Sequence, residues 1–111
     1  MFFIDPIKIQ IDSSLNLNIY GVEFNTAKYS GSKGIDIQKE FKKLQLAARY
    51  ASSKNLYIAA GHGLNTKNLK KLISISEIKE YNIGHSIIGN SIFFGLEESI
   101  KRIHDIIKKR W

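Results

Sequence analysis

Short apolar runs alternate along this chain with longer segments in which apolar residues recur every three or four positions. The short runs are typical of buried strands, and the longer segments are typical of helices that cover a sheet with one face. The expected strands span residues 2–4, 21–24, 56–60 and 81–83. The expected helices span residues 6–15, 35–54, 66–74, 86–94 and 96–109. This order predicts four successive βα units, and therefore an α/β fold with parallel strands and outer helices.

The segment after the first strand allows two interpretations. Ile7, Ile9 and Ile11 alternate with polar residues as in a strand, but Ile7, Ile11 and Leu15 also share one helical face. We favour a helix that Asp5 caps and Pro6 begins. The polar, glycine-bearing segment 25–34 is expected to be a loop.

The 111 residues form one uninterrupted array of βα units, which we interpret as a single unit, 1–111. A closed barrel of eight such units typically takes about 250 residues, more than twice this length. We therefore expect a (βα)4 half of a TIM-type (βα)8 barrel. Four parallel strands expose two sheet edges, so a second chain or a second copy is expected to cover them.

The composition of the chain limits which partners it can bind and in which compartment it works. Its net charge of +7 favours binding to nucleic acid, an acidic membrane surface or phosphorylated small molecules. The lysines are scattered, and aromatic residues are not interleaved among them, which argues against nucleic-acid binding. The chain has no cysteine, and no apolar run reaches the roughly 20 residues that a membrane span needs. We expect a cytoplasmic protein that binds neither nucleic acid nor membrane.

The run AAGHGLN carries the most informative candidate, His62 between Gly61 and Gly63. It follows the third expected strand, where α/β folds place their sites. Flanking glycines let a ligand approach the backbone, and a histidine titrates near neutral pH and can transfer protons. On spacing alone, an ordinary turn with His62 as a surface side chain fits equally well.

A related pattern follows the fourth expected strand, where Gly84 and His85 precede Ser86 and an apolar segment. Free backbone N–H groups at the start of a helix attract anions, and loops after the last strands of a barrel often hold phosphate. The alternative is a simple glycine turn with Ser86 as an ordinary helix-start residue.

Glu23 lies between Val22 and Phe24 in the second expected strand, so its side chain points to the opposite face. If its neighbours face the helices, Glu23 points into the barrel, where an unpaired carboxylate is costly. The alternative is a structural ion pair with a lysine. His104, on the last helix among charged residues, is expected to be solvated.

A metal site built from Glu23, His62 and His85 is conceivable, but the histidines lack a short helical spacing, and the glycines favour anion contact. We expect no metal. The sequence also contains no serine elbow, P-loop or dinucleotide fingerprint.

The segments AAGHGLN, EIKEYNIGHSIIG and FFGLEESI resemble the C-terminal region of the pyridoxine 5′-phosphate synthase family, and the likeness extends upstream through FFIDP and GVEFNTAKYS. The resemblance implies a (βα)8 barrel that condenses 1-deoxy-D-xylulose 5-phosphate with 3-amino-2-oxopropyl phosphate without a cofactor. It implies His62 as proton donor and Gly63 as a ligand contact. It also implies that Gly84 and His85 hold phosphorylated substrate and that Glu23 stabilises a transition state.

The sequence departs from the family pattern at several positions. Where the family usually has Glu-Leu-His-Thr-Gly, this chain has Glu-Phe-Asn-Thr-Ala, with Asn25 and Ala27 in place of the histidine and glycine. Ala59 stands where asparagine is common. The first four βα units of the family, with a basic catalytic histidine, a second glutamate and several arginine ligands, have no counterpart in these residues.

We therefore expect no synthase turnover from this chain alone, because groups that act as a unit lose most of the rate when some are removed. A separately encoded N-terminal half, or a homo-oligomer, would complete it. The alternatives are a non-catalytic phosphate-binding module and a degenerate fragment without a biochemical role.

Overall fold

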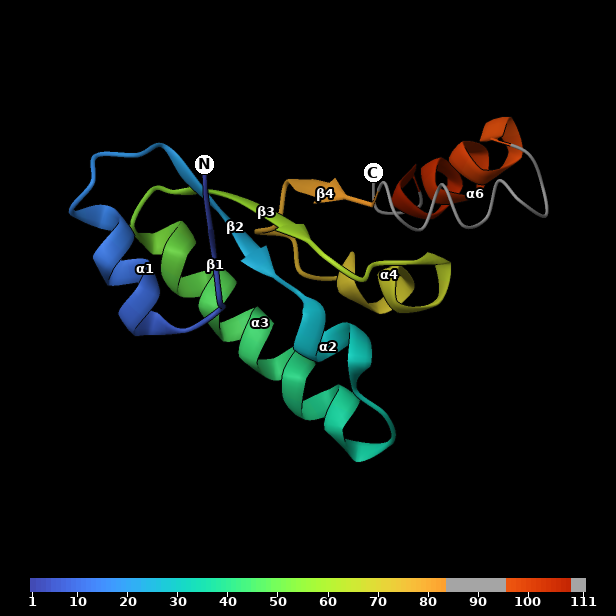
Figure 1. The fold of residues 1–111 in the computed structure, drawn as a ribbon, viewed down its shortest axis with the longest axis horizontal. Coiled ribbons are helices and arrows are strands. Elements are labelled where there is room, and N and C mark those ends of the chain that lie inside the picture. The colour runs from blue at the N-terminus through green and yellow to red at the C-terminus, as the bar shows by residue number, and fades with distance from the viewer. Residues whose placement is uncertain (84–95, 109–111) are drawn as a thin grey trace.

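A computed structural model describes residues 1–83 and 96–108 of the chain (Figure 1). The strands are β1 (Phe2–Ile4), β2 (Gly21–Asn25), β3 (Tyr57–Gly61) and β4 (Glu80–Asn82). The helices are α1 (Lys8–Leu15), α2 (Ala27–Gly31), α3 (Ile35–Ser53), α4 (Thr66–Leu72) and α6 (Leu96–Lys108). The predicted alternation of strands and helices is therefore confirmed for the described residues.

The four strands form one parallel sheet in the order β1-β2-β3-β4, so each strand pairs with its neighbour in sequence. In this register, Glu23 lies opposite Phe3 on one side and Ala59 on the other. Short crossovers through helices produce this order. The result is an α/β fold compatible with part of a TIM-type barrel.

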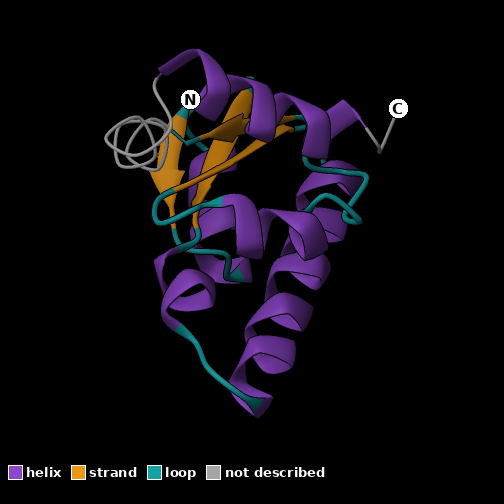
Figure 2. Ribbon diagram, turned by 90° about the vertical axis from the view of Figure 1, so that its right-hand side faces the viewer, coloured by secondary structure: helices purple, strands orange, loops and turns teal. Residues whose placement is uncertain are grey.

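The core lies between the sheet and the helices on one of its faces (Figure 2). On β2, Val22 and Phe24 are fully buried, as the alternation predicted, and Ile58 and Ala60 of β3 extend the same apolar layer. The apolar stripe of α3 packs against them with these buried residues: Phe41, Leu44, Ala47, Ala48 and Ala51. This packing leaves Glu23 on the opposite face of the sheet from the core.

The start of α1 differs from the prediction. The segment is helical, but the helix begins at Lys8 with Ile7 as its N-cap residue, so the assignment of Asp5 as cap and Pro6 as first residue was wrong. Asp5 is engaged elsewhere: its backbone N–H donates to Gln10 Oε1 at 2.7 Å, and its carboxylate accepts from Asn25 Nδ2 at 3.4 Å. Tertiary contacts thus replace the predicted cap.

Most other boundaries agree with the sequence to within one or two residues, the usual uncertainty of helix and strand ends. The exception is α2, which occupies part of the segment predicted to be a loop. The predicted helix 86–94 lies outside the described residues. On α6, Ile103 and Ile106 are buried. His104 is exposed, as predicted.

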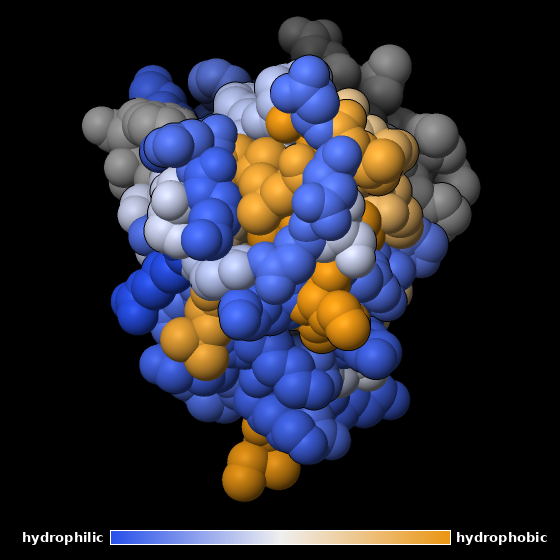
Figure 3. Space-filling view, turned by 90° about the vertical axis from the view of Figure 1, so that its left-hand side faces the viewer, coloured by the Kyte–Doolittle hydropathy of each residue, from blue (hydrophilic) through white to orange (hydrophobic). Residues whose placement is uncertain are grey.

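Apolar patches interrupt the hydrophilic surface on the side that Figure 3 shows. Several large apolar side chains are exposed near the β1 edge, among them Phe2 at 42% and Phe3 at 55%. None of the helices in the described part of the chain combines the length and apolar character that crossing a membrane requires.

Candidate active site

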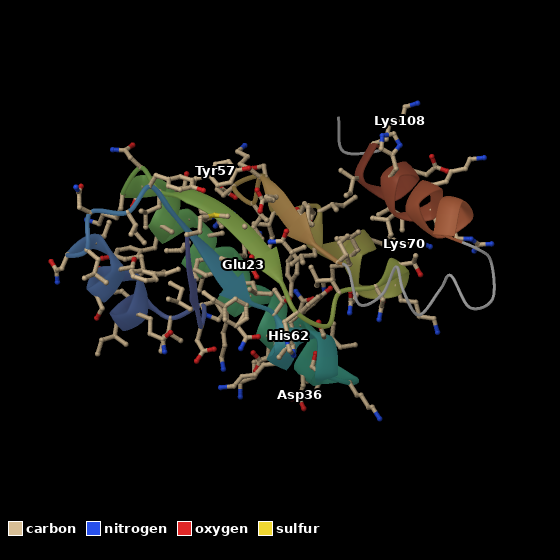
Figure 4. The ribbon with its side chains drawn as sticks, turned by 45° about the horizontal axis from the view of Figure 1, so that its top comes forward. Glu23, Asp36, Tyr57, His62, Lys70 and Lys108 are labelled. Carbon is tan, nitrogen blue, oxygen red and sulfur yellow. The ribbon has the colours of Figure 1, made fainter. Side chains whose placement is uncertain are left out.

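Glu23 occupies the middle of β2, on the face of the sheet away from the helices (Figure 4). The side chain is partly buried, and its Oε1 accepts a hydrogen bond from the amide of Asn82 at the end of β4. Among the residues that the structure describes, the partner of this carboxylate is the Asn82 amide, and the predicted alternative, an ion pair with a lysine, is not seen.

Gly61, the last residue of β3, makes room for this carboxylate. A Cβ atom at position 61 would lie 2.6 Å from Glu23 Oε2 and 3.2 Å from Asn82 Cβ, both closer than ordinary van der Waals contact. Residues from β2, β3 and β4 therefore form one polar cluster near the carboxyl ends of the strands, the edge where parallel α/β folds bind ligands.

His62 follows Gly61 immediately beyond β3, and its side chain is exposed (Figure 4). Its φ angle is +92°, in a region that residues with a Cβ rarely adopt, and Gly63 follows with φ of +77°. Tyr57 lies at the opposite end of the same strand (Figure 4). The predicted Gly-His-Gly turn is thus a tight turn with an unusual backbone, placed directly after the carboxyl end of β3.

Two hydroxyl groups from α2 and its N-cap hold the carbonyls of this turn. Thr26 Oγ1 lies 2.9 Å from the oxygen of Gly61 and 2.7 Å from that of His62, and the Thr26 N–H donates to the Gly61 oxygen at 2.9 Å. Ser30 Oγ donates to the His62 oxygen at 3.2 Å. Neither Thr26 nor Ser30 was predicted from the sequence.

Asn25, one of the departures from the family pattern, joins two segments at the same edge. Its Oδ1 accepts from the N–H of Ala27 at 3.0 Å, and its Nδ2 donates to Asp5 Oδ1 at 3.4 Å. A cavity of about 220 Å³ opens beside it, lined in part by Lys28 and Lys43. Asn25 thus ties the start of α2 to the end of β1.

Tyr29 anchors the far side of α2. The side chain is buried, and its hydroxyl donates to the carbonyl of Asn68 on α4 at 2.6 Å. Burial raises the pKa of the Tyr29 hydroxyl above its usual value, because the charged phenolate would lose its hydration. Tyr29 therefore couples α2 to the helix that follows the histidine turn.

The remaining predicted site residues, Gly84 and His85, lie outside the described residues. Among the residues that the structure describes, no three or more histidine, cysteine, aspartate or glutamate side chains are grouped so that they could hold a metal ion. Of the two residues predicted to be catalytic, Glu23 lies on β2 with its carboxylate beside Gly61, and His62 follows Gly61 directly beyond the end of β3.

Comparisons with known proteins agree on one family. A family model described as the pyridoxal phosphate biosynthesis protein PdxJ matches residues 1–109. A pyridoxine 5′-phosphate synthase from a Sulfurihydrogenibium species is 43% identical over 105 residues, which cover 95% of this chain and 43% of that protein. Synthases from Prochlorococcus marinus subsp. pastoris and Blochmanniella floridana are 41% and 39% identical, each covered over 44% of its length. The chain thus spans less than half the length of these relatives.

Proposed function

Since this chain belongs to the family of the pyridoxal phosphate biosynthesis protein PdxJ, we propose that it contributes half of the active site of a pyridoxine 5′-phosphate synthase. The reaction that we assign condenses 1-deoxy-D-xylulose 5-phosphate with 3-amino-2-oxopropyl phosphate. The observation that carries this proposal is that the Glu23 carboxylate lies beside Gly61, the residue directly before His62, at the carboxyl end of β3. Curated relatives that bear the synthase name support it.

We assign the proton-donor role to His62. Its imidazole is exposed just beyond the end of β3, where a substrate could reach it, and a histidine can give a proton near neutral pH. Gly63 is assigned to ligand contact, because the absence of a side chain brings its backbone N–H within reach of a bound oxygen.

Glu23 is assigned to the stabilisation of positive charge in the transition state. Within the described part of the chain, its carboxylate accepts a hydrogen bond from the neutral amide of Asn82, so we propose that its charge interacts with a developing cation. Electrostatic groups that are fixed before the reaction contribute strongly to catalysis, since they need no reorganisation. The hydrogen bond from Asn82 holds this carboxylate, and the absence of a side chain at Gly61 leaves room for it.

We assign the binding of the substrates' phosphate groups to Gly84 and His85, together with the Gly63 backbone. The net charge of the chain, +7, favours such anionic ligands. The proposed reaction uses neither a metal nor an organic cofactor.

We assign the rest of the active site to the part of the relatives that this chain does not match. The chain corresponds to 43% to 44% of each relative's length, so that remaining part is large enough to supply the other strands of a TIM-type barrel. It would come from a separate N-terminal half or from an oligomer. We therefore expect no turnover from the 111 residues alone.

The test is complementation. The chain is co-produced with the N-terminal part of the Sulfurihydrogenibium synthase that it does not match, in a bacterial strain that requires vitamin B6. Growth without the vitamin, together with a complex on size-exclusion chromatography, is the expected result. Formation of product by the purified chain alone would disprove its dependence on a second part.

Two histidine variants provide a matched pair in this assay. His62→Asn should abolish rescue, because general acid catalysis typically contributes about 10²- to 10⁴-fold. His104→Asn changes an exposed histidine on α6 and should leave rescue intact. If a complex forms but neither rescue nor product appears, while inorganic phosphate shifts the Gly63 amide signal, the chain is a phosphate-binding module without catalysis.

A further inference from the structure

The Gly61-His62-Gly63 turn, called the histidine turn below, has an unusual backbone that contacts from other segments must hold. His62 and Gly63 both have positive φ angles, +92° and +77°. Glycine adopts such angles freely, but a residue with a side chain is strained there unless its surroundings hold it. The other non-glycine residues with positive φ in the described part of the chain, Asn18 at +53° and Asn55 at +63°, lie in the narrow left-handed region that such residues can adopt, whereas His62 lies beyond it. His62 is therefore the strained position.

Thr26 supplies that support from a buried position. Only 1% of its surface is exposed, and its single hydroxyl proton is shared between the carbonyls of Gly61 and His62, at 2.9 and 2.7 Å. Its backbone N–H adds a bond to Gly61 at 2.9 Å. These bonds fix the peptide groups on both sides of the His62 Cα, and so fix the direction of its side chain.

Ser30, one helical turn later, completes the contact. Its Oγ donates to the His62 carbonyl at 3.2 Å, and its own N–H bonds the Thr26 carbonyl at 2.8 Å. A Cβ at Gly63 would lie 2.7 Å from Ser30 Cβ, so the turn sits directly against this side chain. The glycine at position 63 and the serine at position 30 therefore fit each other.

The helix that carries these groups is itself fixed. Asn25 accepts from the N–H of Ala27 at 3.0 Å, and Tyr29 donates to α4 at 2.6 Å. Movement of Thr26 relative to the turn is thus restrained on both sides. Nothing in these contacts reaches the exposed imidazole, so Thr26 acts on it through the backbone.

We propose that Thr26, assisted by Ser30, is a positioning residue that holds the strained His62 turn in the orientation needed for proton donation. The proposal rests on the proposed role of His62 as proton donor. Thr26 touches neither substrate nor reacting atoms in this scheme. It sets the direction from which the imidazole approaches the substrate.

The first experiment uses the 111-residue chain and needs no turnover. Thr26→Val keeps the shape of the side chain and removes its hydroxyl, whereas Thr26→Ser keeps the hydroxyl. In Thr26→Val we expect large shifts of the His62 and Gly63 amide signals and faster hydrogen exchange there, with the α3 amides unchanged; Thr26→Ser should resemble the parent. Unchanged His62 and Gly63 signals in Thr26→Val would overturn the proposal.

The second experiment measures kinetics in the complemented synthase. Thr26→Val should lower kcat roughly 10- to 100-fold, the size expected for a misplaced catalytic group, with KM changed less than about twofold. Thr26→Ser should restore most of kcat, and Thr26→Val should add little to His62→Asn. If Thr26→Val fails to fold, Ser30→Ala takes its place, with an expected loss of several-fold in kcat.

The outcomes separate the two proposals. If His62→Asn leaves the rate unchanged, the proton-donor role fails, whatever the amide signals of Thr26→Val show. If His62→Asn abolishes the rate while Thr26→Val and Ser30→Ala keep the parental kcat, the synthase function stands and the positioning role is wrong.

Discussion

Gly61 offers the sharpest residue-scale test of the candidate site. In Gly61→Ala, the new methyl group would lie 2.6 Å from Glu23 Oε2, so the carboxylate must swing away and lose its bond to Asn82. Since the end of a glutamate side chain moves easily, we expect a stability loss of only about 1 kcal/mol. The complemented synthase should lose activity by about tenfold or more. Urea unfolding and steady-state kinetics measure the two effects.

Gly31 provides the control for this substitution. It ends α2, and a Cβ at this position meets no atom within 4 Å. Gly31→Ala should therefore change the free energy of unfolding by less than about 1 kcal/mol and leave kcat unaltered. Equal loss of kcat in both variants would mean that the contact of Gly61 with Glu23 is irrelevant.

The raised pKa of Tyr29 predicts that the stability of the chain depends on pH. Burial raises its folded-state pKa above the ordinary value of 10.0, so the folded chain keeps this proton at a pH where the unfolded chain releases it. The resulting stability is fully present below about pH 10 and falls as the pH rises further. Urea unfolding from about pH 8 to about pH 11 should show this decline in the parent.

Tyr29→Phe isolates the contribution of this hydroxyl. At the lower pH values, the variant should be less stable by about 1 kcal/mol, because the Asn68 carbonyl loses its donor. Above about pH 10 the difference should shrink, since phenylalanine does not titrate. Parallel pH profiles would show that the Tyr29 pKa does not contribute.

At this scale, the sequence indicated where the candidate residues Glu23 and His62 lie but not which residues hold them in place. Glu23 and His62 could be predicted, because strand alternation and a strand-end turn are local patterns. Thr26 and Asn82 could not, since their contacts join positions far apart in sequence. Threonine and asparagine are common after strands, so nothing local distinguishes these two.

At the scale of an element, the start of α4 connects helix stability to the histidine turn. Asn65 accepts from the N–H groups of Lys67 and Asn68 at 2.9 and 3.0 Å, and Asn68 Oδ1 accepts from the Asn65 N–H at 2.8 Å. Asn68 Nδ2 also donates to the Gly63 carbonyl at 3.1 Å. This reciprocal capping box satisfies N–H groups that the first turn leaves free.

Asn65→Ala should destabilise the chain by about 0.5–2 kcal/mol, the usual effect of losing an N-cap. Asn65→Asp retains an acceptor and should recover most of this stability. Thermal unfolding gives the magnitude, and faster hydrogen exchange of the Lys67 and Asn68 amides localises the change. A loss of stability without any change in those amides would contradict the capping explanation.

Among the described helices, the longest followed from the sequence and the shortest did not. The 19 residues of α3 contain enough turns for an apolar stripe to be recognised. The five residues of α2 make little more than one turn, so no period is visible. Asp5 and Pro6 have the composition of a helix start, yet contacts with Gln10 and Asn25 shift the start of α1 to Lys8.

At the scale of the whole molecule, the β1 edge is the surface that most resembles an interface. Phe3 is 55% exposed on the sheet face that carries Glu23, and β1 is an edge strand of the described sheet. Edge strands with apolar side chains favour pairing with another chain. Phe3→Glu should weaken assembly with the complementing part by about tenfold or more, as measured by sedimentation.

Ile35 gives the matched control for the Phe3 variant. It is 88% exposed at the start of α3, away from the sheet edge. Ile35→Glu adds the same charge and removes a similar apolar surface, so it should leave assembly unchanged. Equal weakening by both substitutions would indicate a general effect of charge instead of an interface at β1.

The strands of the sheet lie in the same order as in the sequence, and this order affects how the chain folds. Each strand pairs with the next strand in sequence, so each pairing closes a loop of modest length, and no distant segment has to be found first. The longest strands, β2 and β3, are joined through α3 and meet in the centre. We expect this β2–α3–β3 segment to form the folding nucleus, with β1 and β4 added afterwards. The candidate site would then take shape only when β4 brings Asn82 to Glu23.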